Sequence, residues 1–419
     1  MSGGNAGPAA AGGPAPRVLL LAGRLAVRAR SAYTLRLARG LPAEGFAAVP
    51  ACVDASQVSW DVRDRLGVRV YRDLDRPLWG RVVREGLLYD LRADPPDLVH
   101  IQSPEMLSCG TYLARRLGRP AVVTFPAVPA GLDRFARLDV RVVRVIAISR
   151  AVAADLVGVS RAPAKRVRVI HSGVDADDNA FVPHPDPAEA AAAGPAAHPA
   201  GDDAPEPCPP ADAVAGPVLP AGRVPVVGTA GPLEVPKGLP YFLGAAARVR
   251  QRFPNARFLL SGAGPEEANL RRLARELGLE PAVTFAPNLL DFSASLAATD
   301  VFCLPSLEQG LGATMLEAMA RGRPVVASGV GGVDSVVEDG ATGLIVPPAD
   351  SAALADGVAA LLADPAAARR MGEAGRAVVR ARFGVARMVA ETAALYRGVL
   401  REWDGTDFED DPDGPRDGP

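Results

Sequence analysis

The chain has 419 residues, of which 48% are hydrophobic and 22% charged, and its formal net charge is −2. This length suits two domains of about 150–200 residues each, and the composition excludes a wholly disordered or fibrous protein. No two of the four cysteines form a Cys-x-x-Cys pair, so the sequence indicates neither a disulfide framework nor a zinc site. We expect a cytoplasmic protein, because the N-terminus lacks a signal-peptide pattern and no apolar run approaches the roughly 18 residues of a membrane span.

Three segments differ from the rest of the chain in composition. Residues 1–16 are rich in Gly, Ala and Pro and predict a disordered N-terminal tail. Residues 176–222 contain eight acidic residues, no Lys or Arg, and dense Ala and Pro, which predicts a linker or a disordered insertion. Residues 402–419 contain eight acidic residues and one arginine and predict a disordered acidic tail. The remaining residues form two bodies, 17–175 and 223–401.

Short apolar runs alternate with amphipathic stretches in the first body, a pattern typical of strand-helix-strand units. The predicted strands are 17–23, 96–102, 120–125 and 144–149. The predicted helices are 32–41, 106–117 and 150–157, the last with Ser149 as its N-cap.

The second body repeats this alternation. Its predicted strands are 224–231, 256–264, 301–306, 324–328 and 343–348. Its predicted helices are 239–251, 266–277, 313–321 and 351–362. Both bodies therefore belong to the α/β class, and we predict two Rossmann-like, doubly wound domains that face each other across a cleft. Ligands of such domains bind at the carboxyl ends of the strands.

Charge is distributed unevenly between the two bodies. Residues 1–175 contain 26 basic and 15 acidic residues, a net charge of +11, whereas residues 223–401 contain 19 and 17. A basic surface raises the local concentration of anionic partners, so we expect an anionic partner and peripheral contact with the inner membrane surface. The alternative is a solvated basic face that the acidic linker and tail cover.

The segment PSLEQGLGATMLEAMARGRPVVAS, residues 305–328, is the most informative motif. A strand ends near Ser306, a glycine-containing loop follows, and a helix begins near residue 313, so amides there can face an anion such as a diphosphate. Glu317 follows in the same helix, where its carboxylate can accept the hydroxyls of a ribose. The residues predicted to surround the phosphates are Gly310, Leu311, Gly312, Ala313 and Thr314. In the alternative interpretation the glycines form a turn and Glu317 complements the helix dipole.

Lys237 is one of only two lysines in the chain, and it lies between a predicted strand and a predicted helix. An ammonium group there can neutralise the charge that develops on a departing diphosphate, a role that requires no metal. The alternative is an ordinary solvated lysine. A third strand-to-helix turn, GAGPEE, places Gly262 and Gly264 where small residues let a flat base approach the backbone.

Other polar residues give weaker signals. Asp-x-Asp pairs occur at 73/75, 175/177 and 411/413, about as many as a chain so rich in aspartate contains by chance, so they do not indicate a metal site. His100 ends a buried strand and is interpreted as a packed residue or part of a cleft wall rather than a base. His171 is interpreted as structural.

The ordered motifs resemble glycosyltransferase family 4, whose members have the two-domain GT-B fold. The resemblance covers nearly all of the chain outside the linker and tails. It is strongest over 226–395, in the motifs KG, GAGP, PSLEQGLG, LEAMARGRPVVAS and DGATGLIVPP, and weaker in PDLVHIQS, VIAISRAVAADLV and VRVIHSGVD. The family resemblance implies that Lys237 holds the donor diphosphate, that Glu317 binds the nucleotide ribose, and that the GLGA amides surround the phosphates and sugar.

Three positions depart from the family pattern. Gln309 stands where the family has a glutamate that contacts the donor sugar, and the adjacent Glu308 is a candidate substitute. Gly231 or Pro232 replaces a family arginine, and Pro126 replaces a histidine. We therefore consider both Gln309 and Glu308 candidate catalytic residues. A glutamine can hydrogen-bond a sugar hydroxyl, but it cannot stabilise a developing positive charge as a carboxylate does.

The resemblance implies a retaining, metal-independent, hexosyltransferase-like enzyme with no cofactor, acting in glycan or glycolipid synthesis. It would move a sugar from a nucleotide-diphosphate sugar to a hydroxyl of a glycan or lipid-linked acceptor, and we expect no nucleic-acid partner. The departures keep open a nucleotide-sugar-binding protein of the same fold with lost or reduced turnover. A sugar-nucleotide epimerase of related fold is the third interpretation.

Overall fold

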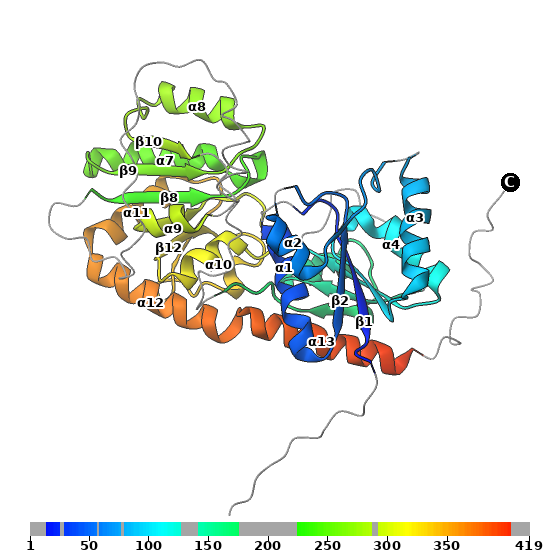
Figure 1. The fold of residues 1–419 in the computed structure, drawn as a ribbon. Helices are drawn as coiled ribbons and strands as arrows, with labels where there is room; N and C mark the ends of the chain where they lie inside the picture. Colours follow the sequence, from blue (N-terminus) through cyan, green and yellow to red (C-terminus); the bar gives the residue numbers. More distant parts are fainter. Residues whose placement is uncertain are drawn as a thin grey trace, which may run out of the picture.

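The computed structural model describes residues 14–25, 29–56, 58–76, 79–126, 141–175, 224–286 and 292–403. Two lobes lie side by side, the first coloured blue to cyan and the second green to orange in Figure 1. Each lobe contains a parallel sheet with alternating helices, which confirms the α/β class and the two Rossmann-like, doubly wound domains. The predicted linker, 176–222, lies outside the described residues, as does most of both predicted tails.

The first sheet has seven parallel strands within the described residues, in the order β3-β2-β1-β4-β5-β6-β7. The order changes direction between β1 and β4. The strands are β1 Arg17–Leu21, β2 Ala47–Cys52, β3 Arg69–Val70, β4 Leu98–Ile101, β5 Ala121–Phe125, β6 Val142–Ala147 and β7 Val167–Val169. The helices between them are α1 Ala29–Gly40, α2 Trp60–Leu66, α3 Trp79–Ala93, α4 Leu107–Leu117 and α5 Arg150–Gly158.

The second sheet has the strand order β10-β9-β8-β11-β12-β13 and changes direction between β8 and β11. Its strands are β8 Val226–Ala230, β9 Arg257–Ser261, β10 Val283–Ala286, β11 Val301–Leu304, β12 Val325–Ser328 and β13 Leu344–Val346. The helices of this part are α7 Leu239–Arg252, α8 Glu267–Glu276, α9 Ser293–Ala298, α10 Ala313–Ala320, α11 Ser351–Ala363, α12 Pro365–Arg382 and α13 Val385–Glu402.

The strands and helices predicted from apolar periodicity all occur, with ends shifted by a few residues. Ser149 is the N-cap of α5, and its hydroxyl accepts a hydrogen bond of 3.2 Å from the amide of Val152. The sequence patterns did not predict β2, β3, β7 or β10. Strands β3 and β7 contain two and three residues, too few to show a periodic pattern.

Helix α13 packs against the first domain, although the predicted domain division places residues up to 401 with the second. Figure 1 shows α12 and α13 running along one side of both lobes. Val389 and the fully buried Tyr396 belong to an apolar cluster with Val18 and Leu20 of β1. A Cβ at Gly40 would lie 2.6 Å from a methyl group of Val389, so only glycine lets the helices approach this closely. The last helix therefore completes the first domain's core.

Among the described helices, none is by itself both long and apolar enough to cross a membrane. Helices α11 and α12 are together long and apolar enough to do so, but they are bent by 105° relative to each other.

Candidate functional site

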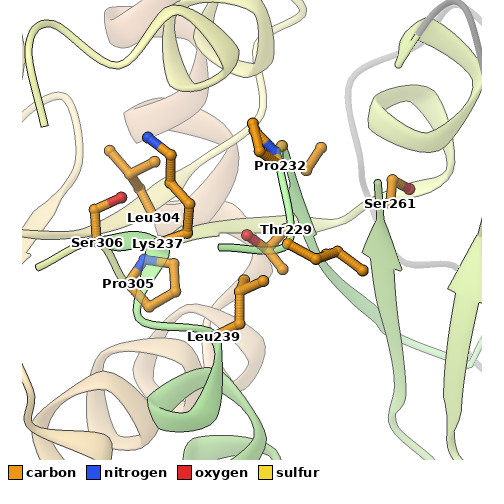
Figure 2. Close-up of a pocket in the computed structure, with 11 residues that line it drawn as sticks. Thr229, Pro232, Lys237, Leu239, Ser261, Leu304, Pro305 and Ser306 are labelled. Atoms are coloured by element: carbon orange, nitrogen blue, oxygen red, sulfur yellow. The ribbon is translucent and has the colours of Figure 1, made fainter. Parts of the chain in front are cut away.

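A pocket lies at the carboxyl ends of β8 and β11, the neighbouring strands where the second sheet changes direction. Figure 2 shows the side chain of Lys237 in this pocket, between Ser306 and Pro232. The pocket is lined by Thr229, Ala230, Gly231, Pro232, Leu233, Lys237, Leu239, Ser261, Leu304, Pro305 and Ser306. Its place at the switch in strand order is where the doubly wound fold predicts a ligand site.

Lys237 is brought to the pocket by a tight approach of two loops. It ends a 3-10 turn, Val235–Lys237, and Gly238 follows with a left-handed φ of 61°. A Cβ at Gly238 would lie 1.9 Å from the carbonyl oxygen of Pro305. Only glycine suits this position, because its φ is left-handed and because a larger residue would clash with the neighbouring loop. Gly238 thereby holds Lys237 beside the segment that follows β11.

Gln309 lies beside Lys237. Its Oε1 accepts a hydrogen bond of 3.0 Å from Nζ of Lys237 and another of 3.2 Å from the hydroxyl of Ser306. The residue that replaces the family's glutamate is therefore in contact with the predicted diphosphate-binding cation. A carbonyl oxygen accepts these bonds without carrying the negative charge that a carboxylate would bring.

Glu308, the other candidate catalytic residue, has an exposed side chain. Its amide donates a 3.3 Å hydrogen bond to the carbonyl of Pro236, so its backbone takes part in the contact between the two loops. The structure thus pairs Gln309 with Lys237 and leaves Glu308 at the surface. The catalytic roles of both remain predictions.

The loop before α10 has the strand-loop-helix geometry that the sequence predicts. Gly312 is the N-cap of α10 with a left-handed φ of 85°, and Leu311 is buried beneath the loop. A Cβ at Gly310 would lie 2.3 Å from the carbonyl oxygen of Pro126 in the first domain. The amides of Ala313 and Thr314 lie in the first turn of the helix, where backbone donors have no acceptor within the helix. This turn therefore offers donors and a positive dipole end to an anion.

Glu317 lies in α10, and 21% of its side chain is exposed. Its Oε1 accepts a hydrogen bond of 3.3 Å from Nη2 of Arg36, which belongs to α1 of the first domain. Its backbone carbonyl accepts a bond of 3.0 Å from Arg321 in the next turn. The predicted ribose ligand therefore has a cationic neighbour from the opposite domain. No sequence pattern singles out Arg36, since arginine is the usual cation throughout this chain.

Gly262 and Gly264 are needed for the packing of two loops. A Cβ at Gly262 would lie 1.9 Å from the carbonyl oxygen of Gly231, and one at Gly264 would lie 2.3 Å from that of Leu233. Gly231 itself has a φ of 149°. These glycines thus bring the loop after β9 against the loop after β8 at the pocket. Their contact with a base remains a prediction.

The residues at two other departures from the family pattern also lie at this site. Pro232 lines the pocket, at one of the two positions where the family arginine was expected. Pro126 directly follows β5, and its carbonyl oxygen faces Gly310. Both positions are therefore at the site, but neither residue has an ionisable side chain.

The two histidines within the described residues are structural. His100 is fully buried, with Nδ1 2.5 Å from the hydroxyl of Tyr396 and Nε2 2.7 Å from that of Thr124. Burial lowers the pKa of His100 from 6.5 to about 3, so it is neutral at ordinary pH. His171 packs edge-on against Phe383, and its pKa is also lowered by burial.

The aspartates of the Asp-x-Asp pairs that the structure describes contact arginines. Asp73 pairs with Arg76 at 2.8 Å, and Asp175 pairs with Arg36 at 3.1 Å. Within the described ranges, no group of three or more His, Cys, Asp or Glu residues is placed to hold a metal ion.

Comparison with known proteins matches one family model to each domain. Residues 31–178 match the model described as Glycosyltransferase Family 4, and residues 224–364 match that described as Glycosyl transferases group 1.

Curated relatives match over part of their length. An alpha-D-kanosaminyltransferase of Streptomyces kanamyceticus is 32% identical over 183 residues, which are 42% of this chain and 46% of the relative. A D-inositol 3-phosphate glycosyltransferase of Kribbella flavida is 38% identical over 186 residues, 41% of this chain and 42% of the relative. The chain therefore aligns with less than half the length of these relatives.

Solved structures match over nearly the whole chain. A glycosyltransferase from Rickettsia africae has a TM-score of 0.70 at 18% identity, covering 93% of this chain and all of that one. Anabaena Alr3699/HepE in complex with UDP and glucose also has a TM-score of 0.70, at 20% identity, covering 91% of this chain and all of that one. At 18–20% sequence identity, the similarity to these structures supports the fold alone.

Proposed function

Because this chain belongs to glycosyltransferase family 4, we propose that it transfers a sugar from a nucleotide-diphosphate sugar to an acceptor hydroxyl. The observation that carries the proposal is the placement of Lys237 at the switch-point pocket, beside the loop that leads into α10. An ammonium group at the pocket, hydrogen-bonded to the loop that precedes a helix N-terminus, offers charge and backbone donors to a diphosphate.

Each residue has a proposed role in binding or in stabilising the leaving group. Lys237 and the amides of Ala313 and Thr314 hold the diphosphate and neutralise the charge that develops on it. Glu317 accepts the ribose hydroxyls, and Gln309 hydrogen-bonds the donor sugar. Lys237 supplies charge that a metal would otherwise supply, so we propose a metal-independent reaction. Retention of anomeric configuration is proposed from the family resemblance.

The acceptor is proposed to be anionic. Two relatives act, by their names, on acceptors that contain phosphate: the D-inositol 3-phosphate glycosyltransferase and a GDP-mannose-dependent phosphatidylinositol monomannoside mannosyltransferase of Mycolicibacterium smegmatis, 37% identical over 164 residues. The net charge of +11 on residues 1–175 agrees with such an acceptor. A phosphorylated polyol or an anionic glycolipid is therefore the proposed class, in glycan or glycolipid synthesis.

Separate measurements of binding and transfer test the proposal. Calorimetric titration with UDP, GDP and their common sugar conjugates gives donor affinity, and incubation with an acceptor panel gives transfer. NMR of the product gives the anomeric configuration, and repetition in EDTA tests metal independence. Transfer with retention in EDTA supports the proposal, whereas absence of nucleotide binding contradicts it.

A second function, nucleotide-sugar binding without turnover, is favoured by one observation: Lys237 donates a hydrogen bond to Gln309, a neutral residue where the family has a glutamate. Donor binding without transfer to any acceptor would support it. Interconversion of a sugar nucleotide without an acceptor would instead support the epimerase interpretation.

A further inference from the structure

Arg36 joins the two domains at the proposed ribose ligand. Its Nη2 donates to Oε1 of Glu317 over 3.3 Å, its Nε to Oδ2 of Asp175 over 3.1 Å, and its Nη1 to the carbonyl oxygen of Gly173 over 3.1 Å. Only 10% of the Arg36 side chain is exposed. Three nitrogens of one guanidinium therefore contact three acceptors, two in the first domain and one in the second.

The two first-domain acceptors are held firmly in place. Val174, between Gly173 and Asp175, donates from its amide to the carbonyl oxygen of Phe383 over 2.8 Å. A Cβ at Gly173 would lie 2.7 Å from Cα of Val385, so this segment packs directly against the start of α13. Because a guanidinium is a planar fork, two anchored nitrogens determine where the third points. Nη2 of Arg36 is thus aimed at Glu317 by the first domain.

We propose that Arg36 is a positioning residue for the donor nucleotide: it fixes the carboxylate of Glu317 so that the ribose hydroxyls meet it in a set orientation. Two carboxylate oxygens offer about four acceptor positions, so a bond from Arg36 to Oε1 leaves room for two ribose hydroxyls. The inference rests on the proposed function, since it takes Glu317 as the ribose ligand. It makes nucleotide affinity depend on the first domain, although the pocket belongs to the second.

The opposite effect is also physically possible, because a cation on Glu317 could compete with the ribose. Positioning predicts that removal of Arg36 weakens nucleotide binding, whereas competition predicts that it strengthens binding. The sign of the change therefore decides between them.

The test uses the full chain and whichever of UDP and GDP the parent binds. Arg36→Met removes the three hydrogen bonds, and Arg36→Lys keeps the charge but not the planar fork. Arg39→Met, an exposed arginine of the same helix, is the matched control. We expect about tenfold weaker nucleotide binding for Arg36→Met, about threefold for Arg36→Lys, and no change for the control.

Two further measurements separate positioning from a general structural effect. Inorganic diphosphate, which lacks a ribose, should bind the parent and Arg36→Met equally. In a Glu317→Gln background, Arg36→Met should cause little additional loss, because residues that act through one another are not additive.

Unchanged or tighter nucleotide binding in folded Arg36→Met or Arg36→Lys would overturn the inference. Equal losses for the nucleotide and for inorganic diphosphate would also overturn it. A parent that binds neither UDP nor GDP would instead contradict the proposed function, on which the inference depends.

Discussion

Nζ of Lys237 and Oε1 of Gln309 lie 3.0 Å apart, so the predicted diphosphate-binding cation is hydrogen-bonded to an amide where the family has a carboxylate. The amide cannot stabilise positive charge that develops on the sugar as the bond to the diphosphate breaks. We therefore expect Gln309→Glu to raise the transfer rate about tenfold or more, with a smaller change in donor affinity. Rates with saturating donor check this. Gln309→Leu is the control, and a slower Gln309→Glu variant would contradict the assignment.

Lys237→Ala should weaken binding of a nucleoside diphosphate by about 1–3 kcal/mol, the scale of a charge-assisted hydrogen bond. Lys237 lies on a short surface turn, so the melting temperature should change little. The chain contains a natural control in its other lysine, Lys165, which lies in the 3-10 turn Ala164–Arg166 of the first domain. Calorimetric titration should show parental affinity for Lys165→Ala. Equal affinities for all three proteins would show that Lys237 does not bind the diphosphate.

His100 makes stability depend on pH. Its pKa is about 3 in the folded protein and close to 6.5 in an unfolded chain, so between these values the unfolded state binds an additional proton. The free energy of unfolding should therefore fall as pH decreases below about 6.5, by up to about 1.4 kcal/mol per pH unit from this residue. His171, whose pKa is also lowered, acts in the same direction.

Denaturant unfolding between pH 7 and 5 checks this expectation. His100→Gln lowers stability by removing contacts with Tyr396 and Thr124, but its pH slope should be shallower than that of the parent. An unchanged slope would mean that folding does not lower the pKa of His100.

Replacing residues 176–222 by a short flexible linker should leave both domains folded. The segment is rich in Ala, Pro and acidic residues and has few large apolar side chains to bury. Scanning calorimetry of the full and shortened chains should give melting temperatures within a few degrees. A large decrease would show that the segment packs against a domain.

The architecture could be predicted because local sequence patterns indicate the strands, the helices and the loops between them. Buried parallel strands such as Leu98–Ile101 are continuous apolar runs, and glycines at strand ends mark the loops at the pocket. Ser149 predicts the start of a helix, and the structure confirms it as the N-cap of α5. Its rarity marks Lys237 and motif spacing marks Gln309, and the structure brings the two residues together.

Contacts between distant parts of the chain could not be predicted in this way. The amphipathic pattern of α13 would suit packing against either domain. It therefore does not predict that Tyr396 contacts His100 in the first domain. Arg36 looks like any other surface arginine until α1 and α10 are placed side by side. Both contacts depend on the tertiary arrangement, which local patterns in a single sequence do not reveal.

Attraction of the first domain to anionic surfaces is the last prediction. Its net charge is +11 over residues 1–175, and helix α3 exposes Val82 and Tyr89 together with Arg81 and Arg92. An exposed helix that combines apolar and basic side chains suits the interface of an anionic membrane. We expect the full chain to bind vesicles that contain phosphatidylglycerol and to ignore vesicles of phosphatidylcholine alone. Sedimentation with vesicles measures this binding.

The dependence on salt and on charge location separates surface attraction from a solvated basic face. Screening acts over about 8 Å at physiological ionic strength, so binding should weaken steeply as salt is raised. Arg81→Gln with Arg92→Gln should reduce binding several-fold, whereas Arg248→Gln with Arg252→Gln, an equal charge change on exposed positions of α7, should not. Removal of residues 404–419 should strengthen binding because it removes acidic charge. If the parent does not bind phosphatidylglycerol vesicles even at low salt, the basic charge serves solubility alone.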